Sequence, residues 1–339
     1  MRRFATPLVV AGILLLGVLA AADALRGSRE STISTRARPA ATSTRPLTLK
    51  ETLAAQRVAG ILVYSDADCR LHSLVLPSLL DQVIRSDRGG PVRFCDFSDA
   101  GGRFTGPGVV ESPNGGEVAS CNDGRIMVRD SNSRKALRSF AGCAPAWRPD
   151  GRLTFARGEQ VFDEGRVIYS RAELHRIARR HPNVAGLGQG VPFRVHVLAL
   201  AWLDRKLLVA SLRVDIESVE PQYFVVLLDG DRILALDAPF GEPARELAVS
   251  PGGAFVAEDN GTMLSRQGRS YDRLEGVPPP RAVVFSPDDG WLAMATGTSV
   301  YLVGTPRNLG RVIRLPIPAQ DLVWEPAGAG ATDTSTTVR

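Results

Sequence analysis

The sequence predicts an all-β protein, a six-bladed β-propeller in which one blade combines strands from the two ends of the chain. A unit of short strands around a tight turn recurs, and its turns are marked by Pro113, Pro149, Asp204, Pro251, Pro287 and Pro326. The intervals between these markers run from 36 to 55 residues. Several short strands in each period of roughly 40 residues indicate a propeller, because small twisted sheets bury their faces only by stacking on one another.

The clearest copy of the unit lies in residues 281–303 and predicts strands at 283–286, 291–295 and 299–303. Its first turn is Pro287-Asp288-Asp289-Gly290, in which proline fixes φ, aspartate tolerates unusual backbone and glycine accepts a positive φ. The residues two positions before the markers are Glu111, Trp147, Trp202, Val249, Phe285 and Trp324. All of them except Glu111 are large and apolar. We therefore interpret the three tryptophans as core between blades rather than as a platform for ligand stacking.

The two ends of the globular region complement each other. Residues 322–324 supply an innermost strand with nothing after it, whereas 60–64, 70–76 and 92–97 read as later strands that lack a first one. We expect residues 322–324 to pair with 61–64. That pairing gives five contiguous blades and one composite blade, and it removes the exposed sheet edges of an open array.

The S-P-x-G and R-P-D-G turns, each followed by an apolar strand, resemble the WD-type repeats of the TolB-like propeller family. The resemblance covers about residues 58–326, and the fourth blade departs from it at Leu203-Asp204-Arg205. It implies an extracytoplasmic recognition or scaffolding role. A fold alone does not determine function, so this role is an expectation that the site must support.

Composition divides the chain into a signal-anchor or signal peptide (1–25), a disordered linker (26–46), the propeller (47–326) and a disordered tail (327–339). Residues 4–22 carry no charge and follow Arg2-Arg3. They are long enough for a transmembrane helix, the interpretation we favour, but Ala22-Asp23-Ala24 also fits a cleavage site. The positive pair stays cytoplasmic, which predicts a single-pass membrane protein with an extracytoplasmic propeller, or a protein secreted after cleavage.

The net charge of +5 is unevenly distributed. Residues 1–50 hold eight basic and two acidic side chains, so they contribute +6 and the remainder of the chain carries −1. A nucleic-acid-binding domain carries its basic excess on the folded face, so we set that function aside. Thr48 and Glu51 form a capping box that predicts a short helix, with Leu49, Leu53 and Ala54 as its apolar face.

The chain has four cysteines, Cys69, Cys95, Cys121 and Cys143. An even number in an exported protein predicts two disulfides, for which three connectivities are possible. The shortest loops favour Cys69–Cys95 and Cys121–Cys143. The sequence contains no C-x-x-C motif that would indicate a metal site instead.

The longest marker interval contains an inserted helix. A second capping box, Ser170 with Glu173, begins it, and Pro182 is expected to end it. The candidate partner-binding residues on this helix are Arg171, Arg176, Arg179 and Arg180. Inserted segments on a repeat scaffold often carry recognition, but the same pattern also fits a solvated surface helix docked by Leu174 and Ile177.

The sequence carries no catalytic, phosphate-binding or cofactor motif, and we expect no cofactor and no metal. His196 falls in an apolar strand pattern that favours a structural role, and His72 also lies within a strand pattern. We predict a monomeric, non-catalytic scaffold of the cell envelope that binds a protein or wall ligand. The alternatives are a propeller enzyme, metal-dependent and lactonase-like or lyase-like, and the sensor domain of an envelope complex.

Overall fold

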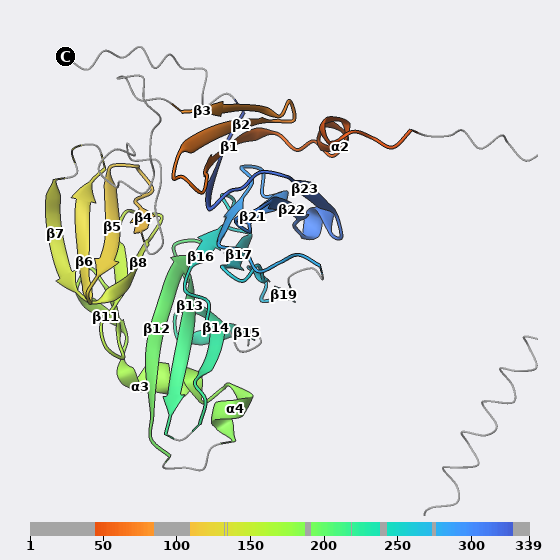
Figure 1. Ribbon diagram of the computed structural model, residues 1–339. Helices are drawn as coiled ribbons and strands as arrows, with labels where there is room; N and C mark the ends of the chain where they lie inside the picture. Colours follow the sequence, from red (N-terminus) through yellow and green to blue (C-terminus); the bar gives the residue numbers. More distant parts are fainter. Residues whose placement is uncertain are drawn as a thin grey trace, which may run out of the picture. The chain divides into compact units, whose positions relative to one another are not determined.

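The computed structural model describes residues 45–84, 109–131, 133, 135–186, 191–217, 219–237, 243–272 and 276–327. These residues form six four-stranded antiparallel sheets, which confirms the all-β prediction (Figure 1). Within these ranges no helix is long and apolar enough to cross a membrane. The predicted anchor at residues 4–22 lies outside the described residues, as do the linker up to residue 44 and the tail from residue 328.

Sheet 1 joins the two ends of the chain, as the sequence predicts. Its strand order is β24-β1-β2-β3, and β24 runs antiparallel to β1 with Trp324 opposite Leu62. Its strands are β1 (Gly60–Ser65), β2 (Leu71–Leu76), β3 (Leu80–Val83) and β24 (Asp321–Glu325). The third strand predicted for this region, 92–97, lies outside the described residues, and β3 takes the outer position instead. All four residues of β3 are exposed, so β3 lacks the apolar pattern that reveals a buried strand.

The other five sheets are each built from four consecutive strands. Sheet 2 comprises β4 (Val109–Glu111), β5 (Glu117–Asn122), β6 (Arg125–Asp130) and β7 (Ala136–Ala141). Sheet 3 comprises β8 (Cys143–Trp147), β9 (Leu153–Ala156), β10 (Val161–Asp163) and β11 (Arg166–Tyr169). Sheet 4 comprises β12 (Phe193–Trp202), β13 (Leu207–Ile216), β14 (Gln222–Asp229) and β15 (Arg232–Asp237).

Sheets 5 and 6 complete the set. Sheet 5 comprises β16 (Leu247–Val249), β17 (Phe255–Glu258), β18 (Met263–Ser265) and β19 (Ser270–Tyr271). Sheet 6 comprises β20 (Ala282–Phe285), β21 (Trp291–Ala295), β22 (Val300–Gly304) and β23 (Val312–Leu315), with a 3-10 turn η1 (Pro306–Asn308) before β23. Helix α2 (Leu49–Ala55) begins at the predicted Thr48 capping box and buries Leu53, whereas Ala54 is exposed and does not belong to its apolar face.

A buried polar side chain holds the repeated turn. Ser286 Oγ accepts a hydrogen bond from the Trp291 amide at 2.9 Å, and Ser250 Oγ accepts one from the Phe255 amide at 3.1 Å. In sheet 4 the proline turn is replaced, and Asp204 Oδ1 accepts from the amide of Leu207 at 2.8 Å. The sequence departure in the fourth unit therefore keeps the side-chain-to-backbone bond that closes the turn.

Neighbouring sheets share apolar clusters, which connect sheets 2 to 3, 3 to 4, 4 to 5, 5 to 6 and 6 to 1. Trp147 Nε1 donates to the carbonyl of Val110 in sheet 2 at 3.1 Å, and Trp202 Nε1 donates to Thr154 in sheet 3 at 2.9 Å. These contacts confirm that both tryptophans belong to the junctions between sheets. The described residues contain no cluster shared by sheets 1 and 2, between which residues 85–108 lie outside the described part of the chain.

Candidate functional site: the far end of sheet 4

The strands of sheet 4 are longer than those beside them. β12 and β13 each have ten residues, whereas β8 in sheet 3 has five and β16 in sheet 5 has three. The extra length lies at residues 193–197, 212–216 and 222–224, a part that we call the far end of sheet 4 (Figure 1). The two faces of this end differ in character, and they are described in turn.

The inserted helices cover the first face. Helices α3 (Arg171–Ala178) and α4 (Pro182–Ala185) share a buried cluster with sheet 4, in which Leu174 and Ile177 accompany Leu212 and Phe224. Docking of the helix by Leu174 and Ile177 is thus confirmed, as is its Ser170 capping box. Pro182 does not merely end the helix: it occupies the first turn of α4, where its fixed φ and missing N–H are tolerated.

Glu159, in the loop before β10, fastens the helix to the sheet. Its Oε1 accepts a hydrogen bond from the Val195 amide at 2.8 Å and lies 2.7 Å from His175 Nε2, while Oε2 lies 2.8 Å from Arg171 Nε. Burial alone would raise the pKa of Glu159, but the hydrogen bonds from Val195 and His175 and the nearby positive charges lower it below its ordinary value. One carboxylate therefore connects β12, α3 and the loop of sheet 3.

All four predicted arginines are exposed; Arg171 and Arg176 lie on α3, and Arg179 and Arg180 follow its last residue. Arg171 pairs with Glu159, Arg176 Nη2 donates to the carbonyl of Asp231 at 3.4 Å, and the Arg179 guanidinium lies 5.0 Å from the Phe193 ring centroid. Each of these three also helps to dock the helix. Arg180 is exposed at the end of the helix. Their role in partner binding stays a prediction.

The second face of the far end carries polar side chains from three strands. The register places Arg194 opposite Asp215, and His196 opposite Arg213, which in turn lies opposite Tyr223. Asp215 joins two of them, because Oδ2 lies 3.1 Å from His196 Nε2 and Oδ1 lies 2.6 Å from Arg213 Nε. The side chain of His196 is 46% exposed rather than enclosed by the apolar strand pattern, and its pairing with Asp215 is compatible with the structural role expected for it, which stays a prediction. In the sequence, Arg194 and His196 alternate with the apolar residues Phe193 and Val195. This alternation is the signal that could have predicted a strand with one polar and one buried face.

His181 lies between the two inserted helices and is only 3% exposed. Its ring stacks on Phe224 with centroids 4.9 Å apart, and neither ring nitrogen has a hydrogen-bond partner among the described residues. Burial lowers the pKa of His181, because the charged imidazolium loses its hydration in this apolar site. The neutral ring is thus the form that fits the cluster.

A separate polar cluster lies in sheet 1. His72 Nε2 is 3.2 Å from Asp66 Oδ2, and its Nδ1 is 3.4 Å from Asp81 Oδ1. The ring stacks on Tyr64 at 4.7 Å, and the Tyr64 hydroxyl donates to Asp81 at 2.8 Å. Burial and this hydrogen bond raise the pKa of Tyr64. Asp66 also accepts from the Arg70 amide at 2.8 Å, as expected of a turn residue.

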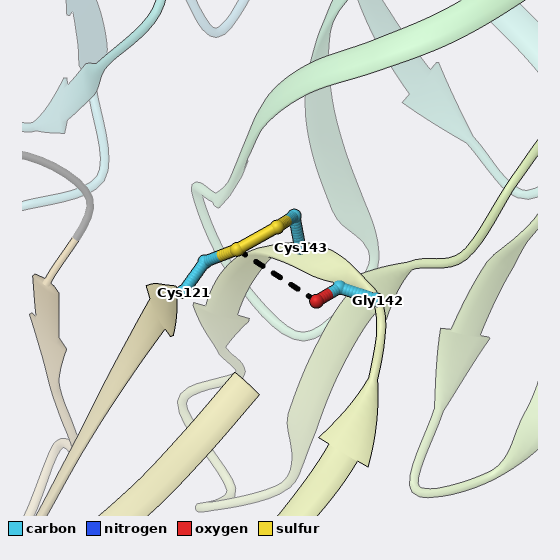
Figure 2. Close-up of a disulfide and its surroundings, with 3 residues drawn as sticks. All are labelled: Cys121, Gly142 and Cys143. Atoms are coloured by element: carbon cyan, nitrogen blue, oxygen red, sulfur yellow. Dashed lines mark hydrogen bonds between the residues drawn. A yellow bond between two sulfur atoms is a disulfide. The ribbon is translucent and has the colours of Figure 1, made fainter. Parts of the chain in front are cut away.

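The disulfide between Cys121 and Cys143 is present as predicted, and it links β5 of sheet 2 to β8 of sheet 3 (Figure 2). Cys121 Sγ also approaches the carbonyl of Gly142 at 3.7 Å. Gly142 has φ +135°, and a Cβ there would collide with the carbonyl of Ala156. Cys69 is disulfide-bonded, but Cys95 lies outside the described residues, so the Cys69–Cys95 pairing stays a prediction.

Within the described ranges, no three His, Cys, Asp or Glu side chains are grouped so as to hold a metal ion. The chain matches no family model, and the search of curated proteins finds no similar protein. The TolB-like resemblance consequently depends on the repeat pattern alone.

Proposed function

We propose that the chain is an extracytoplasmic six-bladed propeller that binds a partner without catalysing a reaction, as a scaffold of the cell envelope. A helix at residues 4–22 holds it at the membrane. The observation that carries the proposal is the far end of sheet 4, where a helix pair is fastened to unusually long strands. Binding residues concentrate on segments that a rigid scaffold positions, and sites supported by helices and strands are held more precisely than sites on loops.

Closure of the ring is the first part of this proposal. Five neighbouring pairs of sheets share apolar clusters, and sheet 1 combines strands from both chain ends. Sheets 1 and 2 form the sixth junction. Val63 and Leu71 of sheet 1 form a further buried cluster with Ile61, Ile84 and Val323, distinct from the cluster shared with sheet 6, and this supplies an apolar surface for that junction.

The compartment is the second part. The Cys121–Cys143 disulfide and the disulfide-bonded state of Cys69 support an oxidising environment outside the cytoplasm. Together with the uncharged segment at 4–22 behind Arg2-Arg3, they favour export with the propeller on the outer side of the membrane.

Site-specific photo-cross-linking in intact cells tests the binding surface. A photoreactive residue replaces Arg176 on α3 or Arg180 in the turn between α3 and α4, and Arg311, directly before β23, serves as an exposed control position. We expect one adduct of defined mass in the membrane fraction from both helix positions and none from position 311. Equal adducts at all three positions, or none at 176 and 180, would refute a binding role for the inserted helices.

A catalytic function is the second candidate, and the observation that favours it is His72 between two carboxylates and against a tyrosine. Imidazole, carboxylate and phenol are the groups that transfer protons in enzymes. The test is the purified chain against a panel of lactones and uronate esters, alongside His72→Gln. Turnover that disappears in the variant would establish this function, and no turnover in the wild-type chain would reject it for these substrates.

A further inference from the structure

One face of sheet 4 changes its chemistry along its length. Near the junction with sheet 5, Val209 and Leu227 lie opposite each other and pack into a buried cluster with Val256 and Leu264. Four residues further along β13 on the same face, Arg213 lies opposite Tyr223. Along each strand, the residues of this face alternate with the buried residues of the other face. Because the face becomes polar beyond its cluster with sheet 5, we interpret this part of it as a solvent-facing surface.

Asp215 gives this surface a fixed arrangement. It binds Arg213 through Nε and His196 through Nε2. Since Nε is the atom that Asp215 occupies, the hydrogens on the two terminal nitrogens of Arg213 are left to donate to a ligand. The Arg213 side chain is 40% exposed, so these donors are accessible. A carboxylate that already orients a guanidinium reduces the side-chain conformational entropy that is lost when a ligand binds.

The charge and spacing of the surface point to its occupant. Arg194 and Arg213 carry two positive charges against Asp215, and the register makes them diagonal neighbours on adjacent strands. Side chains at such positions lie about 7–8 Å apart. Acidic side chains at alternate positions of an extended peptide lie about 7 Å apart on one side, which matches this separation.

We propose that this polar face binds an extended acidic segment of a protein partner, with carboxylates at alternate positions on Arg194 and Arg213. His196 and Tyr223 flank the two arginines on the same face. The inference names the partner chemistry for the binding role proposed above and rests on that role. Because hydrogen bonds between a carboxylate and a guanidinium require a defined geometry, the arrangement favours a peptide whose carboxylates have this spacing over an acidic ligand held by charge alone.

The test uses the purified full-length chain in non-ionic detergent and a fluorescently labelled, blocked peptide Glu-Thr-Glu-Thr-Glu, measured by anisotropy. A peptide of the same composition with the order Glu-Glu-Thr-Thr-Glu, in which no two glutamates stand at alternate positions, controls for charge without spacing. The variants are Arg213→Gln and Arg194→Gln. Arg138→Gln is the matched control, because Arg138 is also 40% exposed and also pairs with a carboxylate, that of Glu117 at 2.6 Å.

We expect saturable binding of the alternating peptide, about tenfold weaker or more in Arg213→Gln and in Arg194→Gln and unchanged in Arg138→Gln. The rearranged peptide should bind more weakly than the alternating one. Unchanged affinity in both variants, an equal loss in the control, or no saturable binding would overturn the inference. So would competition by inorganic phosphate at the concentration of the peptide, because it would indicate a simple anion site.

The two proposals fail separately. Failure of peptide binding, with cross-links retained at positions 176 and 180, refutes the acidic-peptide inference and leaves the scaffold role standing. Loss of those cross-links together with peptide binding refutes the scaffold role itself, and loss of the cross-links alone refutes a binding role for the inserted helices.

Discussion

Trp324 Nε1 donates a hydrogen bond of 3.2 Å to the carbonyl of Ala59, which lies 265 positions earlier in the chain. Gly60, the next residue, has φ +126°, and a Cβ there would collide with the Trp324 indole. Trp324 is 6% exposed and packs in the cluster shared by sheets 1 and 6. The end of the chain therefore contributes a side-chain anchor to sheet 1 as well as a strand.

Replacing this anchor should destabilise the whole chain. We expect Trp324→Ala to lower the free energy of unfolding by about 3–5 kcal/mol, because it removes a large buried side chain and leaves a cavity. Urea denaturation followed by circular dichroism measures the change. Deleting residues 328–339 is the control, since it leaves β24 whole and should have no effect. A loss below about 1 kcal/mol in Trp324→Ala would show that sheet 1 does not depend on this end.

The inter-sheet disulfide should stabilise the junction of sheets 2 and 3. Cys121 and Cys143 are 22 positions apart, and a loop of that size is worth about 3 kcal/mol in the chain-entropy account. We expect Cys121→Ser with Cys143→Ser to unfold at correspondingly lower denaturant, and reductant to lower the midpoint of the wild type by more than that of the variant, which keeps the disulfide of Cys69. Equal midpoints with and without the bond would contradict its stabilising role.

Glu159→Gln should loosen the inserted helix. At neutral pH we expect faster amide hydrogen exchange in α3 and a loss of about 1–3 kcal/mol, because charge-assisted hydrogen bonds weaken. The pKa of Glu159 is lowered by folding, so its contribution is present above the ordinary value of 4.5 and is lost as the pH falls through its folded pKa. Wild type and variant should therefore converge under acid conditions. A difference that persists unchanged below pH 4 would rule out the charge of Glu159 as the cause.

His181 predicts a second pH effect in the same helices. Its pKa is lowered by folding, so the unfolded chain binds the proton more readily, and stability is lost as the pH falls below the ordinary value of 6.5. We expect hydrogen exchange in α4 to accelerate in that window, and His181→Phe, which keeps the stacking on Phe224, to abolish the acceleration. The same pH response in His181→Phe would assign the effect to another group.

The sequence predicts those parts of the fold that depend on local pattern. The Ser170 capping box, the Pro287 turn and the pairing of the Trp324 segment follow from spacing and from the need of small sheets to stack. The extra length of the strands in sheet 4 does not follow from local pattern, because the residue at which a strand ends depends on its pairing with the neighbouring strands. The roles of Glu159 and Asp215 were missed because both residues act across loops or strands, where sequence distance gives no guide.

The pairing of the chain ends is the claim on which the rest depends, and a paired cysteine variant tests it most directly. Val63 and Val323 lie opposite each other on β1 and β24, within the range in which a disulfide can form. In Val63→Cys with Val323→Cys, peptide mapping of the unreduced protein by mass spectrometry should find a bond between positions 63 and 323. Free thiols at both positions, or pairing of either with a native cysteine, would contradict the account.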